Sequence, residues 1–155
     1  MIKFDLTNLF FQGLPETIAI AALVCALIGQ RLDWKKIFAV GVLQVLTIYL
    51  IRLLPITFGI HTFLGIFTLA IYSHLIYKHN LLNTIISSIV CIVLLMLLEN
   101  LIQQPILLAL DLTMEEANKN DLLWILMGWP QVIGLLAAAL LTNRYNLRKG
   151  RVVNG

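Results

Sequence analysis

The sequence predicts an all-α membrane protein, a polytopic transmembrane bundle of about five helices. Of its 155 residues, 60% are hydrophobic and only 12% are charged, whereas a soluble domain carries about 25% charged residues. So few charges do not provide the polar surface that a water-soluble globule needs. A bilayer core of roughly 30 Å requires about 20 apolar residues per helix. Five such helices with short loops account for most of the chain, and we expect one integral membrane domain over residues 1–155.

The apolar runs are separated by polar or proline-containing loops. We expect spans at residues 14–30, 37–54, 60–77, 81–110 and 122–142. Pro15 suits the first turn of the first span, where its missing N–H has no cost. Trp34 is placed as an interface anchor before the second span, and Pro55 ends that span. The aromatic-rich residues 4–13 are expected to lie along the interface before the first span.

The fourth apolar run is longer than one membrane thickness but too short for two spans and a turn. Its 30 residues contain a single charge, Glu99. One tilted or kinked helix fits, and Pro105 is the expected kink. A polar loop, residues 111–121, separates it from the fifth span, and a basic tail follows that span.

The distribution of lysine and arginine predicts the orientation, because cytoplasmic loops are enriched in both residues. Of the eleven such residues, eight fall in the first loop, the third loop and the tail. They are Arg31, Lys35, Lys36, Lys78, Arg144, Arg148, Lys149 and Arg151. Lys3, Arg52 and Lys119 fall on the opposite side. We therefore expect the N-terminus outside, the C-terminus in the cytoplasm, and a multi-pass protein of the plasma membrane.

Polar side chains within the predicted spans gather toward the outer half of the bundle. Because such groups are costly in lipid, they need a partner or water. The candidate polar cluster comprises Glu16, Arg52, His61, Glu99, Gln103 and Gln131. It predicts an outward-facing pocket that recognises a peptide or small molecule, with Glu99 as its charge and Arg52 as its partner. A purely structural pair at the headgroup level fits the same residues, and both interpretations stay open here.

Helical spacing assigns several of these residues to shared faces. In the fourth span one face carries Thr84, Ser88, Cys91, Glu99 and Gln103. In the third span one face carries His61, Gly65, Thr68 and Tyr72. Small residues allow close helix packing in membranes. The expected packing positions are Ala22, Ala26, Gly65, Gly134 and Ala138.

Other function classes receive little support from the sequence. Hydrolase and phosphate-binding motifs such as HExxH and Gly-x-Ser-x-Gly are absent, so we expect no enzyme and no cofactor. Cys25 and Cys91 have no cysteine or histidine at ligand spacing, so we expect no metal site. The net charge of +3 is divided between one loop and the tail, and it does not favour a nucleic-acid partner.

Four segments, in order and spacing, resemble a known family. They are RLLPITFGIHTFLGIF (52–67), LENLIQQPILLAL (98–110), LTMEEA (112–117) and GWPQVIGLLAAALL (128–141). They resemble the membrane sensor region of accessory-gene-regulator-type and sporulation-type sensor histidine kinases of Gram-positive bacteria. That resemblance implies detection of an extracellular signal, often a peptide, and its transfer to a cytoplasmic kinase in two-component signal transduction.

The chain departs from that family because it ends about a dozen residues after the last predicted span. No phosphoacceptor helix and no ATP-binding domain follow. We therefore expect a stand-alone membrane sensor or regulatory subunit that acts through a membrane or cytoplasmic signalling partner or as a homo-oligomer. A small transporter or channel subunit with an intramembrane Glu/His/Arg cluster is the alternative. We expect such a path to carry polar groups through the full membrane thickness. A scaffold without a ligand is a third possibility.

Overall fold

The computed structural model describes residues 9–54, 58–113, 116–117 and 120–151. Within these residues the regular structure is helical, in agreement with the predicted fold class. A short π-helix, η1 (Leu9–Gly13), leads into α2 (Leu14–Leu27), which is followed by α3 (Trp34–Arg52) and α4 (Phe58–Tyr77). Two longer helices complete the bundle: α5 (Leu81–Leu110) and α7 (Asp121–Arg148).

Among the described residues, five helical segments are long and apolar enough to cross a membrane, as the sequence predicts. They are Phe10–Leu27, Trp34–Arg52, Ile60–Tyr77, Leu81–Leu110 and Leu122–Arg148. The fourth run forms one continuous helix that contains Pro105. This arrangement is that of a multi-pass membrane protein.

Local capping explains several helix ends. Asp33 accepts a hydrogen bond from the Lys35 backbone N–H at 3.0 Å and begins α3, and Asn80 accepts one from Leu82 at 2.9 Å and begins α5. Both are the side-chain caps that orphan N–H groups at a helix start require. Gly29 has a φ of +74°, a left-handed conformation that glycine adopts without strain. It turns the chain after α2, so the helix ends before Gln30, where the first span was expected to end.

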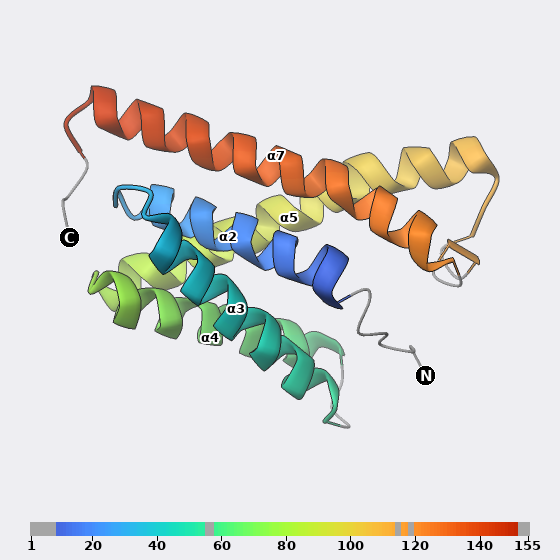
Figure 1. Cartoon of the computed structure of the whole chain (residues 1–155), viewed down its shortest axis with the longest axis horizontal. Helices are drawn as coiled ribbons and strands as arrows, with labels where there is room; N and C mark the ends of the chain where they lie inside the picture. Colours follow the sequence, from blue (N-terminus) through green and yellow to red (C-terminus); the bar gives the residue numbers. More distant parts are fainter. Residues whose placement is uncertain (1–8, 55–57, 114–115, 118–119, 152–155) are drawn as a thin grey trace.

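Helix α2 occupies the centre of the bundle. It packs against α3, α4, α5 and α7, and Figure 1 shows it between α3 and α7 with α5 behind. Every residue from Ala19 to Ala26 is buried. A helix that is apolar on all sides belongs in such a central position. Its many alanines keep it thin enough for four neighbours to surround it.

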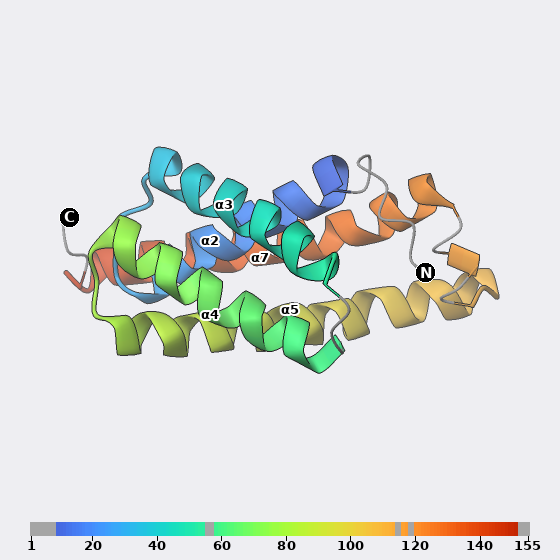
Figure 2. The same cartoon turned by 90° about the horizontal axis from the view of Figure 1, so that it is seen from below.

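Helices α5 and α7 are longer than the other three. At 1.5 Å per residue, the 30 residues of α5 span about 45 Å and the 20 residues of α4 about 30 Å. Both views show the C-terminal part of α5 and the N-terminal part of α7 continuing past α2, α3 and α4 (Figures 1 and 2). We call the part of α5 after Gln103 and of α7 before Gln131 the hairpin extension. Leu107, Ala117 and Met127 form its small separate hydrophobic core.

Both ends of the described chain differ from expectation. Residues 9–13 are helical and continuous with α2, whereas the sequence predicts an interfacial segment there. Gln12 is buried against Gly128 of α7, which draws this turn into the bundle. At the other end α7 continues to Arg148, six residues beyond the predicted boundary at 142. Asn146 donates to the Ala26 carbonyl at 2.8 Å and fastens this extra turn to α2.

Candidate functional site

A chain of polar side chains links three helices inside the bundle. The Gln103 amide of α5 donates to the Gln131 side-chain oxygen of α7 at 3.4 Å. The Gln131 amide in turn donates to the Glu16 carboxylate of α2 at 3.5 Å. Both glutamines are 2% exposed. These bonds are longer than the 2.9–3.0 Å typical of N–H···O contacts, so the side chains meet without being tightly fixed.

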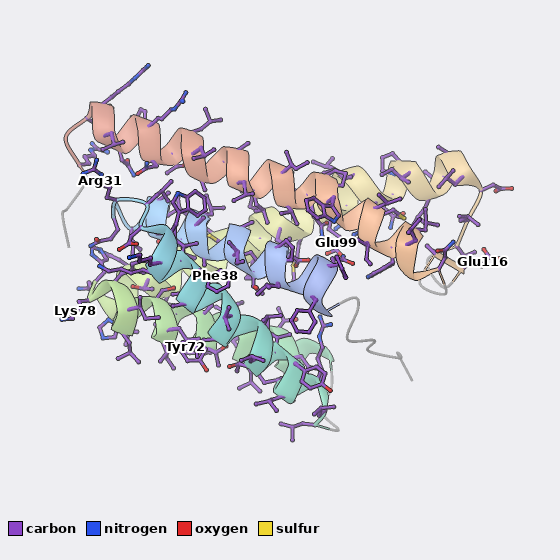
Figure 3. All side chains as sticks on the ribbon, in the orientation of Figure 1. Arg31, Phe38, Tyr72, Lys78, Glu99 and Glu116 are labelled. Atoms are coloured by element: carbon purple, nitrogen blue, oxygen red, sulfur yellow. The ribbon has the colours of Figure 1, made fainter. Side chains whose placement is uncertain are left out.

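Two further charges belong to this cluster. Glu16 interacts electrostatically with Glu99 of α5 and Arg52 of α3, and Arg52 attracts both carboxylates. Glu16 and Glu99 are partly buried, while Arg52 is exposed at the end of its helix. Figure 3 shows Glu99 on α5 beside the start of α2. We call Glu16, Arg52, Glu99, Gln103 and Gln131 the polar network; it contains five of the six predicted cluster residues and involves four helices.

One acceptor in the polar network has no hydrogen-bond partner in the part of the chain that the structure describes. The side-chain oxygen of Gln103 makes no hydrogen bond within the described part of the chain, although it is buried. A buried polar atom without a partner costs about 1–3 kcal/mol. Among the described residues, the polar network therefore retains one unpaired acceptor, on the helix that also carries Glu99.

His61 contacts the backbone of α3 at Ile51, the residue before Arg52 of the polar network. Its Nε2 lies 3.1 Å from the carbonyl oxygen of Ile51 in the last turn of α3. The last carbonyls of a helix lack intrahelical partners, and this contact supplies one when the ring nitrogen carries the proton. In this position His61 joins the ends of α3 and α4.

The remainder of the predicted α4 face also contacts α3. The amide of Gln44 donates to the Gly65 carbonyl at 2.8 Å, and the Thr68 hydroxyl donates to the Gln44 side-chain oxygen at 3.2 Å. The hydroxyls of Thr47 and Tyr72 lie 2.7 Å apart. We call these five residues the α3–α4 seam. It places the buried Gln44 amide and three partly buried hydroxyls near the middle of the bundle, whereas the sequence analysis expects polar groups mainly toward the outer half.

Gln44 and Thr47 escaped the sequence analysis. Each lies alone within a hydrophobic stretch of α3, and neither is charged. The helical spacing of polar residues in the third span, on the other side of the loop after α3, could have pointed to them. In two antiparallel neighbours, polar positions 44 and 47 align with the polar face of the third span.

The predicted packing residues separate into two groups. Ala22 and Ala26 are fully buried, Ala138 packs against the main core, and Gly134 lies close to Leu98 of α5, 3.3 Å from the position of an added Cβ. Gly65 differs, because a Cβ there would meet nothing within 4 Å. Gly65 is buried and contacts α3 through its carbonyl, which accepts the Gln44 amide, and not through the space left by its missing side chain.

The tightest approaches occur at two other glycines. A Cβ on Gly41 of α3 would lie 2.7 Å from Cγ1 and 3.1 Å from Cα of Ile18 in α2. A Cβ on Gly128 of α7 would lie 2.5 Å from the Gln12 amide nitrogen. A single sequence does not show which glycine faces which neighbour, so these two were missed.

The cysteines lie in apolar helix contacts. Cys25 and Cys91 are both buried and free. Among the described residues no group of three or more His, Cys, Asp or Glu side chains could hold a metal ion.

Comparison with known proteins adds no relative: no family model, no curated protein and no solved structure matches the chain. The site is therefore interpreted from its own geometry.

Proposed function

We propose that this chain is an integral membrane sensor or regulatory subunit of the plasma membrane. In this proposal it detects an extracellular or membrane signal and acts through a partner protein or a second copy, by recognition and without catalysis. The unpaired Gln103 oxygen carries the proposal. A ligand that donates a hydrogen bond there would satisfy an acceptor that the folded chain leaves free. The sequence resemblance to sensor regions supports the same interpretation.

The helices that hold the two glutamines are suited to transmit a change. Pro105 lies inside α5 and Pro130 inside α7, each within two residues of a network glutamine. A proline inside a helix removes one backbone hydrogen bond and weakens the helix locally. The hairpin extension can therefore bend against the rest of α5 and α7 at the level of the polar network. Because both helices run uninterrupted to the opposite end, a shift there reaches that end.

The orientation is part of the proposal. With the eight cations of the loops and tail in the cytoplasm, the polar network and the hairpin extension lie toward the outside. Reporter fusions at Lys36 and His79 should give cytoplasmic signals, and a fusion at Asn120 an external one. A cytoplasmic signal at Asn120 contradicts this orientation.

The sensor function is tested by neutralising one network charge. Spin labels at Leu75 of α4 and Leu141 of α7, both lipid-facing, with exposed fractions of 63% and 67%, report the packing away from the polar network. Glu99→Gln should shift their mean separation by about 1–2 Å, the size of helix shifts in switching proteins, and spare folding. Asp111→Asn is the matched control, because it removes one carboxylate from the end of the same helix. Its φ of 53° is one that asparagine tolerates.

A structural role predicts the opposite pattern. Glu99→Gln would then lower the unfolding temperature and leave the separation unchanged. That result would remove the sensor proposal.

A small transporter or channel subunit is the second candidate, and the α3–α4 seam favours it. The seam brings polar groups to mid-depth between α3 and α4, and the buried hydroxyl of Ser73, the residue after Tyr72, has no partner among the described residues. Such a series could continue a path beyond the polar network. Proteoliposomes loaded with a pH-sensitive dye test it: proton flux that Gln44→Leu abolishes supports transport, and no flux above protein-free vesicles argues against a proton path.

A further inference from the structure

A basic cavity lies at the end of the bundle opposite the hairpin extension. It has a volume of about 650 Å³ and is formed by the loop after α2, the first turn of α3 and the last residue of α4. This size is within the range of small-molecule sites, roughly 300–1,000 Å³. The cavity is separate from the polar network, and the proposed function does not use it.

Three cations and one carboxylate line this cavity. The cations are those of Arg31, Lys35 and Lys36, and the carboxylate is that of Asp33. The Asp33 side chain is engaged in capping, since it accepts the Lys35 backbone N–H at 3.0 Å. The cavity also lies at the N-terminus of α3, a helix of 19 residues, whose dipole favours an anion. The site is thus electropositive.

Tyr77, the last residue of α4, belongs to the wall of the same cavity. The residue lines the cavity and is only 3% exposed, and its hydroxyl has no hydrogen-bond partner within the described chain. The neighbouring Cys25 thiol is directed at the carbonyls of Gln30 and Arg31, at 3.9 and 3.5 Å. The Cys25 sulfur is the electrostatic neighbour of this hydroxyl. Because sulfur is only a weak acceptor, a ligand oxygen would be a stronger partner for the Tyr77 hydroxyl.

The depth of the cavity suits a lipid headgroup. Trp34 lines the cavity and is 54% exposed, and tryptophan is enriched where the hydrocarbon core meets the headgroups. Basic pockets at the ends of transmembrane helices are suited to phosphate-bearing headgroups. Arginine and lysine at one site, with a hydroxyl beside them, match the oxygens of a phosphate group.

We propose that this cavity is a binding site for a phosphate group, carried by an anionic phospholipid headgroup or free in solution. Arg31, Lys35 and Lys36 supply the charge, and Tyr77 donates a hydrogen bond. The site serves to anchor the α2–α3 loop against the end of α4.

The lipid source is tested by fluorescence in nanodiscs. In the Trp124→Phe/Trp129→Phe background Trp34 is the remaining tryptophan, and brominated phosphatidylglycerol titrated into phosphatidylcholine quenches it when bound nearby. Lys35→Gln/Lys36→Gln should raise the half-quenching mole fraction about 25-fold, since each Lys or Arg near a membrane surface contributes roughly fivefold and the variant removes two of them. Arg144→Gln/Arg148→Gln removes the same charge from the same end of the bundle outside the cavity, and should change it less than twofold. Tyr77→Phe, which keeps the ring, should raise it about threefold.

The soluble source is tested with inorganic phosphate in discs of phosphatidylcholine alone. Phosphate should raise the unfolding temperature of the unsubstituted protein and of the Arg144→Gln/Arg148→Gln variant. The Lys35→Gln/Lys36→Gln variant should lose this rise in unfolding temperature. Selective loss in the quenching arm assigns the site to lipid, and selective loss in the phosphate arm assigns it to a free anion. Equal effects of the two double variants in both arms would show only general surface attraction and would overturn the proposal. Absence of quenching together with absence of protection in the unsubstituted background would overturn it as well.

Discussion

The two ends of the bundle use their polar residues in opposite ways. At the end that carries the hairpin extension, carboxylates and amides point inward and meet between helices, with contacts of 3.4 and 3.5 Å. At the basic end the cations Arg144, Arg148 and Lys149 are exposed, while small residues such as Ala22 and Ala26 fill the interior. Inward polar groups with long bonds leave a region able to rearrange, whereas a close-packed interior resists change. The difference suits the recognition proposed for the first end and the anchoring proposed for the second.

The largest expected effect comes from the close-packed interior. Gly41→Leu places a branched side chain where a Cβ alone lies 2.7 Å from Ile18 Cγ1. The backbone of Ile18 lies 3.1 Å from that Cβ and does not move easily. We therefore expect the free energy of unfolding to fall by about 3 kcal/mol, or the bundle to fail to assemble. Steric-trap unfolding in bicelles measures it.

Gly65→Ala is the matched control for Gly41. The added Cβ meets nothing within 4 Å, and alanine favours the helix by about 0.5–1 kcal/mol over glycine. The variant should be neutral or slightly more stable. Equal destabilisation by both changes would refute the assigned helix contacts.

A smaller effect is expected in the polar network. Arg52→Gln removes the cation that attracts both Glu16 and Glu99. We expect the free energy of unfolding to fall by about 1–2 kcal/mol. This is less than the 3–5 kcal/mol lost when one partner of a fully buried ion pair is removed, because Arg52 is exposed. Adding Glu16→Gln should restore about half of the loss, since one of the uncompensated carboxylates is then gone. Strict additivity of the two substitutions in a double-mutant cycle would show that these residues do not interact.

The smallest effect is expected in the α3–α4 seam. Tyr72→Phe removes the hydroxyl that lies 2.7 Å from Thr47. Hydrogen bonds between membrane helices contribute about 0.6 kcal/mol on average, and a loss of this size should appear in chemical unfolding. A loss above about 2 kcal/mol would assign the seam a larger share of the stability than this account gives it.

The sequence predicts much of the helical framework because the membrane imposes a strong pattern. Each predicted span corresponds to a helix of the structure, and Glu99 and Gln103 lie on the face of α5 whose other polar members, such as Ser88, are buried. Helix ends were less accurate, since the last turn of α7 depends on the contact of Asn146 with α2. That contact joins residues 120 positions apart and leaves no local signal.

The site was harder to predict than the framework. Charges in apolar runs are conspicuous, so Glu16, Arg52 and Glu99 could be selected from the sequence, and the structure places them together. The contact of His61 with the Ile51 carbonyl could not be predicted, because it depends on how the start of α4 lies against the end of α3. The difference between Gly41 and Gly65 has the same origin, since both are glycines in apolar helices and only the tertiary arrangement shows which one faces a neighbour.

Cysteine cross-linking across the polar network tests most directly whether α5 and α7 meet there. In a background with Cys25→Ser and Cys91→Ser, the pair Gln103→Cys/Gln131→Cys should form a disulfide rapidly in membranes, because these two buried side chains are in contact. The pair Leu101→Cys/Ile133→Cys is the control; both residues lie two positions away on exposed faces, at 70% and 61% exposure. Fast cross-linking of the first pair with little of the second is the predicted result. Cross-linking of the Leu101/Ile133 pair with none at Gln103/Gln131 would contradict the polar network and the functions proposed for it.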